Sequence, residues 1–125
     1  MITLTVNDTI TLHRLLTEEA GTADGLRDRG LLESSVHSQN AAFGNTEVYP
    51  TVAEKASRLF FSLVSNHAFA DGNKRVGLLA YLTTLALNGI TLCATDRELI
   101  SITLALAAGE IGYDEVLAFT EKYAS

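Results

Sequence analysis

Cysteine, proline and tryptophan are almost absent from this chain of 125 residues, which has one Cys, one Pro and no Trp. Because Cys93 stands alone, it cannot form an internal disulfide, and the sequence favours a reducing compartment. The N-terminus lacks a basic region followed by an apolar stretch, so we expect no secretion signal. A single proline excludes a proline-rich linker protein. Together these absences predict a cytoplasmic protein.

Long apolar runs and net positive charge are lacking too. The longest uncharged stretch, residues 76–95, is interrupted by threonines, Asn88 and Gly89, so it predicts a buried helix and a turn rather than a membrane span. The net charge of −6 disfavours general attraction to nucleic acids or acidic membranes, and we expect neither as a partner. With 47% hydrophobic and 19% charged residues, the chain is typical of one globular domain over residues 1–125.

Capping boxes mark three helix starts. In a capping box, a hydroxyl and a carboxylate three residues later accept hydrogen bonds from the free backbone N–H groups at a helix start. The boxes are Thr5 with Asp8, Thr51 with Glu54 and Thr95 with Glu98. Apolar residues follow each box at helical spacing. The sequence therefore predicts helices over about residues 5–19, from 51 to about 66, and from 95 to the glycines at 109–112.

Three further helices complete the expected fold. Apolar spacing predicts a short second helix from residue 31 to about 41 and a final helix around residues 116–119. A central helix follows Asp71, a candidate N-cap, and ends at Gly89. Only residues 2–6 and 90–93 are candidate strands. The fold class is thus all-α, a compact bundle of about six helices.

One segment concentrates reactive groups at the junction of the two central helices. In the sequence HAFADGNKR, residues 67–75, Gly72 lets a phosphate approach the backbone and Asn73 can donate a hydrogen bond. The free N–H groups of a helix start attract anions. Lys74 and Arg75 are unfavourable at that end unless something negative binds there. The pattern therefore indicates a phosphate site.

A carboxylate and an imidazole lie beside this phosphate site. Asp71 is placed to hold a magnesium ion that also contacts phosphate oxygens, and His67 can take a proton from an incoming hydroxyl. Structural explanations remain open: His67 as a solvated helix end, Asp71 as a plain N-cap, Phe69 as an apolar plug between helices, and the two cations as an ordinary solvated surface pair. The other histidines, His13 and His37, do not pair at ligand spacing, so a zinc site has little support.

The segment HAFADGNKR resembles the signature of the Fic/Doc superfamily, H-x-F-x-[DE]-[GA]-N-[GK]-R. The matching residues are His67, Phe69, Asp71, Gly72, Asn73 and Arg75. Many Fic proteins have Pro, Gly and a second Arg where this chain has Ala68, Lys74 and Leu78. These departures are typical of the Doc (death-on-curing) branch, which residues 25–36, GLRDRGLLESSV, also resemble.

The resemblance implies the Fic/Doc fold and a toxin of a type II toxin-antitoxin system, controlled by a Phd-like antitoxin. Such a toxin transfers the γ-phosphate of ATP to a hydroxyl of a translation factor, elongation factor Tu, and arrests translation. It implies ATP and Mg²⁺ as cofactors. Carried over by position, His67 is the general base, Asp71 the metal ligand, and the phosphate-binding residues are Gly72, Asn73, Lys74 and Arg75. An adenylyl transferase and an inactive nucleotide-binding module remain alternatives.

Residues 21–30, a glycine-rich segment, correspond to the region called the flap in Fic relatives. There the resemblance implies docking of the target through strand-like backbone contacts, which in this chain involves Gly25, Leu26, Arg27 and Asp28. The alternative is an ordinary linker in which Asp28 caps the second helix. The sequence leaves both interpretations open.

Overall fold

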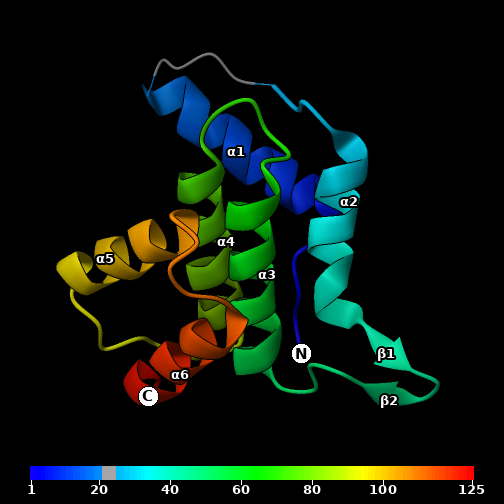
Figure 1. Cartoon of the computed structure of the whole chain (residues 1–125), viewed down its shortest axis with the longest axis vertical. Coiled ribbons are helices and arrows are strands. Elements are labelled where there is room, and N and C mark those ends of the chain that lie inside the picture. The colour runs from blue at the N-terminus through cyan, green and yellow to red at the C-terminus, as the bar shows by residue number, and fades with distance from the viewer. Residues whose placement is uncertain (21–24) are drawn as a thin grey trace.

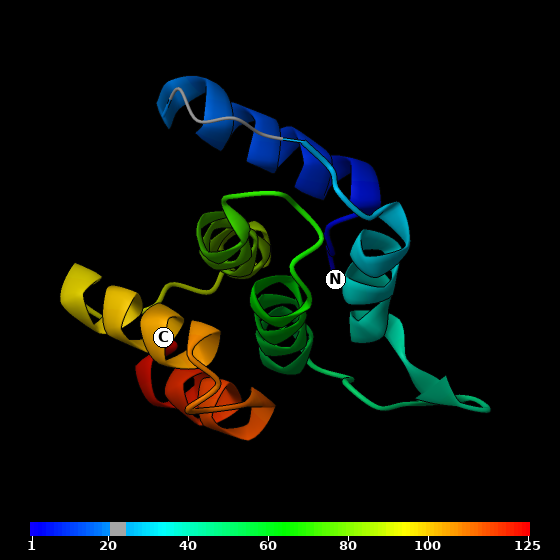
Figure 2. The same ribbon diagram turned by 45° about the horizontal axis from the view of Figure 1, so that its top comes forward.

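The described part of the chain folds as six α-helices, two of which form a central pair. The structure is a computed structural model that describes residues 1–20 and 25–125. The helices within this part are α1 Val6–Ala20, α2 Arg29–His37, α3 Val52–Asn66, α4 Asn73–Leu87, α5 Asp96–Ala107 and α6 Tyr113–Tyr123. The helices α3 and α4 lie side by side at the centre, with α1 and α2 on one side and α5 and α6 on the other (Figures 1 and 2). The expected all-α class is confirmed.

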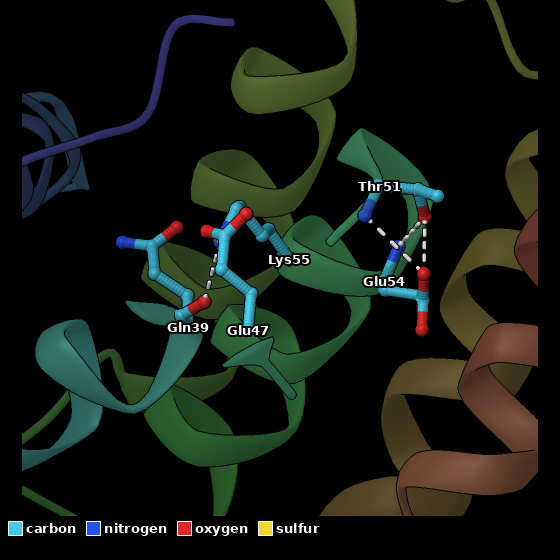
Figure 3. Close-up of polar contacts among 5 residues, drawn as sticks. All are labelled: Gln39, Glu47, Thr51, Glu54 and Lys55. Atoms are coloured by element: carbon cyan, nitrogen blue, oxygen red, sulfur yellow. Dashed lines mark hydrogen bonds and ion pairs between the residues drawn. The ribbon is translucent and has the colours of Figure 1, made fainter. Parts of the chain in front are cut away.

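The three expected capping boxes are all formed. At the start of α3, the Thr51 hydroxyl accepts a hydrogen bond from the Glu54 backbone N–H at 3.1 Å, and the Glu54 carboxylate accepts one from the Thr51 N–H at 3.2 Å (Figure 3). The boxes at Thr5 and Thr95 have the same reciprocal bonds. Local sequence therefore fixes where α1, α3 and α5 begin.

Two local expectations were wrong. The N-cap of α4 is Gly72, not Asp71, because Gly72 takes the left-handed conformation with φ +82° and places the Asp71 carboxylate outside the helix. Residues 2–6 form no strand and run directly into the box that opens α1, while residues 90–93 contain only an isolated antiparallel bridge, between Leu92 and Ala124. The described strands are β1 Ala42–Phe43 and β2 Thr46–Glu47, which form a two-residue hairpin turn at Gly44 and Asn45.

A buried lysine fixes this hairpin to the bundle. Lys55 on α3 is 3% exposed, and its ammonium group donates to the Gln39 carbonyl at 3.1 Å and to the Glu47 carboxylate at 2.8 Å (Figure 3). The Gln39 amide donates in turn to the Leu4 carbonyl at 3.1 Å. A buried charge is tolerated when it is paired and hydrogen-bonded in this way. The lysine thus joins α3, the hairpin and the N-terminal segment.

Gly77 allows α3 and α4 to approach closely. A Cβ added at Gly77 would lie 2.6 Å from Cγ2 of Val64, a stiff, buried side chain. We expect Gly77→Ala to lower the free energy of unfolding by about 1–2 kcal/mol, although alanine favours a helix more than glycine does. Urea unfolding measures this change in the free energy of unfolding. The double variant Val64→Ala/Gly77→Ala should recover part of the loss, and a Gly77→Ala protein as stable as the original would contradict the close contact.

None of the helices in the described residues is long and apolar enough to cross a membrane.

Candidate functional site

The loop between α3 and α4 has left-handed backbone at both ends. His67 ends α3 with φ 52° and ψ 47°, and Gly72 precedes α4 with φ +82°. Such a conformation costs about 1 kcal/mol for a residue with a side chain. Strained residues of this kind cluster at functional sites, where the surrounding contacts hold them. Among the described residues, His67 is the only non-glycine residue with a positive φ.

Phe69 and Asn73 hold this loop from inside. Phe69 is 2% exposed, as the expected apolar plug. The Asn73 carboxamide accepts a hydrogen bond from the Phe69 N–H at 3.1 Å and donates one to the Phe69 carbonyl at 2.9 Å. Asn73 therefore closes the loop onto the first turn of α4. Its expected contact with phosphate stays a prediction.

His13 on α1 packs against this loop and supports it. Its ring is 3% exposed and stacks on Phe69, with 3.8 Å between ring centroids and 11° between planes. Its Nε2 lies 2.6 Å from the Asp71 carbonyl oxygen. Because a carbonyl oxygen only accepts, Nε2 carries the hydrogen and donates it. No local pattern indicates this role, since His13 and Asp71 are 58 positions apart.

The backbone of the predicted flap pairs with the same loop. The Arg27 and Asp28 N–H groups donate to the Ala68 carbonyl at 2.9 and 3.0 Å, and the Ala70 N–H donates to the Gly25 carbonyl at 3.1 Å. These hydrogen bonds flank an antiparallel bridge between Leu26 and Phe69. The loop that carries the signature is thus held along its length by a neighbouring segment.

The predicted docking residues also have structural roles. The Arg27 guanidinium donates to the His67 carbonyl at 2.7 Å, and an Asp28 carboxylate oxygen accepts from the Leu31 N–H at 3.0 Å. The expected cap of α2 by Asp28 is therefore confirmed. Leu26 forms the bridge with Phe69. Residues 21–24 of the flap lie outside the described residues, and target docking stays a prediction.

The predicted site residues come together around one open cleft of about 540 Å³. Its lining consists of His67, Ala70, Asp71, Gly72, Asn73, Lys74, Arg75 and Ala107. Six of these were expected from the sequence as site residues, and two were not: Ala70, within the loop itself, and Ala107, at the end of α5, which nothing local relates to this loop. The flap residues 25–28 do not line the cleft.

The cleft carries positive charge at the start of α4. Lys74 and Arg75 are exposed, and within the described residues neither forms an ion pair with a carboxylate. The first-turn N–H groups of α4 begin at Asn73 and add the positive end of the helix dipole. Two unpaired cations and a helix start are an arrangement that stabilises a bound polyanion.

Asp71 supplies the carboxylate among the residues that line the cleft. It is exposed, and one of its oxygens accepts a hydrogen bond from the Gly72 N–H at 2.8 Å. In the described part of the chain, no three metal-binding side chains cluster. Mg²⁺ in phosphate sites is typically held by one or two carboxylates together with phosphate oxygens and water. A single exposed carboxylate beside a polyanion site fits such an ion.

Gly72 has little room for a side chain, which gives a test of the site. A Cβ there would lie 3.2 Å from His13 Nε2, at a positive φ. We expect Gly72→Ala to lower the free energy of unfolding by about 1–2 kcal/mol. It should also weaken binding of inorganic tripolyphosphate, measured by calorimetry, about tenfold, because the start of α4 shifts.

Gly89 provides a matched control for this variant. Its φ is +77°, and a Cβ there would have nothing within 4 Å. Gly89→Ala should therefore show a similar loss of stability without any change in tripolyphosphate affinity. Equal affinities for the two variants would show that the conformation of Gly72 does not shape the anion site.

Comparisons with known proteins agree with this geometry. The model of the family described as "Fic/DOC family" matches residues 3–85, more than half of the chain, and this range includes the whole loop and the first turns of α4. The protein named Toxin Doc from Mycolicibacterium smegmatis (strain ATCC 700084 / mc(2)155) is 42% identical over 69 residues, which cover 55% of this chain and 53% of that protein. The matched region thus spans about half the length of that curated relative. With the family match, the loop and the cleft in agreement, the chain belongs to the Fic/DOC family, and the resemblance to its Doc branch is confirmed.

Proposed function

We propose that this protein is a phosphoryl transferase that acts as the toxin of a type II toxin-antitoxin system. Its substrates are ATP, used with Mg²⁺, and a hydroxyl of elongation factor Tu, so that translation stops in the cytoplasm. The observation that carries the proposal is the cleft, where His67, Asp71 and the cationic start of α4 face one space. The Toxin Doc name of the similar protein supports the toxin role.

Each group of the cleft has a step to perform. His67 removes the proton from the target hydroxyl, whose oxygen then forms a bond to the γ-phosphorus as the bond to the β-phosphate oxygen breaks and ADP leaves. Lys74, Arg75 and the first N–H groups of α4 hold and neutralise the phosphates. Asp71 would hold Mg²⁺, which supplies further neutralisation of phosphate charge when bound. Phosphoryl transfer depends mainly on such positioning and charge, which this small site can provide.

The positions of Lys74 and Leu78 favour γ-phosphoryl over adenylyl transfer. Lys74 lines the cleft, where many Fic proteins have glycine, and therefore fills space and adds charge that a pyrophosphate group would otherwise occupy. Leu78, one turn further along α4, replaces the second arginine of those relatives and is not among the residues that line the cleft. A second anchor for that pyrophosphate group is thereby removed.

Isotope labelling separates the two reactions. Purified protein is incubated with elongation factor Tu, Mg²⁺ and ATP labelled on either the α- or the γ-phosphate. We expect label on the factor from the γ position only. Transfer from the α position only would establish adenylyl transfer, and no transfer from either would favour the inactive binding module.

The flap supports docking of an extended target segment. Leu26 forms a non-hydrogen-bonded pair with Phe69, since the flanking bonds run from Ala70 to Gly25 and from Arg27 to Ala68. In such a pair, the N–H and C=O of Leu26 point to the opposite edge. An added strand can use that edge.

A Phd-like antitoxin is the proposed partner, and its co-expression should relieve the growth arrest.

A further inference from the structure

Arg27 contacts the backbone of two successive residues in the loop that carries the signature. Its guanidinium Nη2 donates a hydrogen bond to the His67 carbonyl at 2.7 Å, and its backbone N–H donates one to the Ala68 carbonyl at 2.9 Å. The first of these bonds joins positions 40 residues apart. A hydrogen bond from a charged donor is stronger than one between neutral groups. The Arg27 side chain thus holds the peptide unit that follows the predicted base.

That peptide unit sets the angle between the base and the anion site. His67 ends α3 with ψ 47°, and rotation about its Cα–C bond would turn its carbonyl together with everything that follows, including Asp71 and the start of α4. The left-handed conformation of His67 costs free energy for a residue with a side chain, and it persists only where surrounding contacts hold it. Among the described residues, only the Arg27 guanidinium binds the His67 carbonyl.

The residues on either side of His67 are held by other groups. The Asn66 carboxamide donates to the Ser35 hydroxyl on α2 at 2.7 Å. The Asp28 N–H donates to the Ala68 carbonyl at 3.0 Å. Neither bond involves the Arg27 side chain, so both remain when that side chain is removed. Loss of the guanidinium should therefore loosen the peptide unit of His67 without unfolding the loop.

We propose that Arg27 is a positioning residue for the general base, because its guanidinium holds the His67 carbonyl and so keeps the imidazole aligned with the phosphate site. The inference rests on the proposed function. Arg27 does not line the cleft, so it acts through His67 and not on the nucleotide. This role differs from the target docking that the resemblance implies for the same residue. A docking residue contributes to the affinity for the protein substrate, whereas a positioning residue contributes to the rate after binding.

The test measures kcat and KM for transfer of the γ-phosphate from ATP to elongation factor Tu. In Arg27→Ala, we expect kcat to fall about tenfold, while KM for the factor, KM for ATP and the affinity for tripolyphosphate each change less than twofold. A tenfold loss corresponds to a base that is aligned for about a tenth of the time. Arg27→Lys, which keeps a charged donor on a flexible stem, should recover part of the rate. All assays are run well below the melting temperature of each variant.

The variant Arg29→Ala is the matched control. Arg29 is the first residue of α2, and its exposed guanidinium lies 3.8 Å from the Glu33 carboxylate on the same helix. An exposed ion pair of this kind contributes little stability. Because Arg29→Ala also removes one positive charge from this segment, it reveals any general effect of charge on docking. We expect its kcat to stay unchanged.

A measurement without turnover separates this inference from the proposed function. The Cα and Cβ chemical shifts of His67 report its backbone conformation, and we expect them to change in Arg27→Ala but not in Arg29→Ala. Unchanged shifts or an unchanged kcat in Arg27→Ala would overturn the proposal, as would an equal loss of kcat in both alanine variants. A loss confined to KM for the factor would assign Arg27 to docking instead. A parent protein that transfers no phosphate would contradict the proposed function, and the shifts alone would then decide whether Arg27 fixes His67.

Discussion

Replacing His67 with Asn is expected to slow transfer of the γ-phosphate from ATP by a factor of about 10²–10⁴, the usual contribution of a general base. Asparagine is chosen because it tolerates the left-handed conformation that His67 adopts, with φ 52°, better than most residues. The loop should therefore keep its shape while the proton acceptor is lost. Steady-state labelling of elongation factor Tu measures the effect, and expression of this variant should no longer arrest growth.

His37 supplies the control for this experiment. It is exposed at the end of α2 and does not line the cleft, so His37→Asn should leave the rate unchanged. Affinity for tripolyphosphate should be retained in both variants. A His67→Asn protein that transfers phosphate at the original rate would exclude His67 as the base and favour a role in ending α3 only.

Replacing His13 with Ala is expected to lower the free energy of unfolding by about 3 kcal/mol. The change removes a buried ring stacked on Phe69, leaves a cavity, and removes the hydrogen bond to the Asp71 carbonyl. For a domain of this size, the melting temperature should fall by roughly 10 °C. Transfer activity should fall as well, because Asp71 and Gly72 lose the support that fixes them beside the cleft.

Two further substitutions separate packing from positioning. His13→Phe keeps an aromatic ring beside Phe69 but has no donor for Asp71, whereas His13→Gln keeps an N–H donor without the ring. We expect His13→Phe to regain most of the stability while ATP affinity and the transfer rate stay reduced. We expect His13→Gln to regain most of the ATP affinity and transfer rate while its stability stays reduced. If His13→Phe restored stability and kinetics together, the hydrogen bond would have no part in positioning the loop.

Local patterns predicted much of this protein because they depend on residues that are close in sequence. The capping boxes at Thr5, Thr51 and Thr95 fix helix starts through bonds three residues apart, and all three are formed. The nine residues from His67 to Arg75 form one loop and one helix turn, so most of them line the same cleft because they are close in sequence.

Expectations failed where a local pattern had more than one physical solution. Asp71 and Gly72 both fit a helix start, and the contacts that select Gly72 come from α1, through His13. The hairpin at Gly44 carries a turn signal, but its strands are too short to show an alternating pattern. Lys55 then decides where that hairpin lies.

By itself, the sequence determined the starts of α1, α3 and α5, the loop that carries the signature and the family resemblance, because each of these is encoded within about ten consecutive residues. Only the tertiary structure decided that His13 supports Asp71, that the flap pairs with the loop, and that Ala107 closes the cleft. The bond from Arg27 to the His67 carbonyl likewise exists only because the flap lies beside the end of α3. These contacts join segments separated by tens of residues, and the packing of the helices, rather than any local pattern, brings them together.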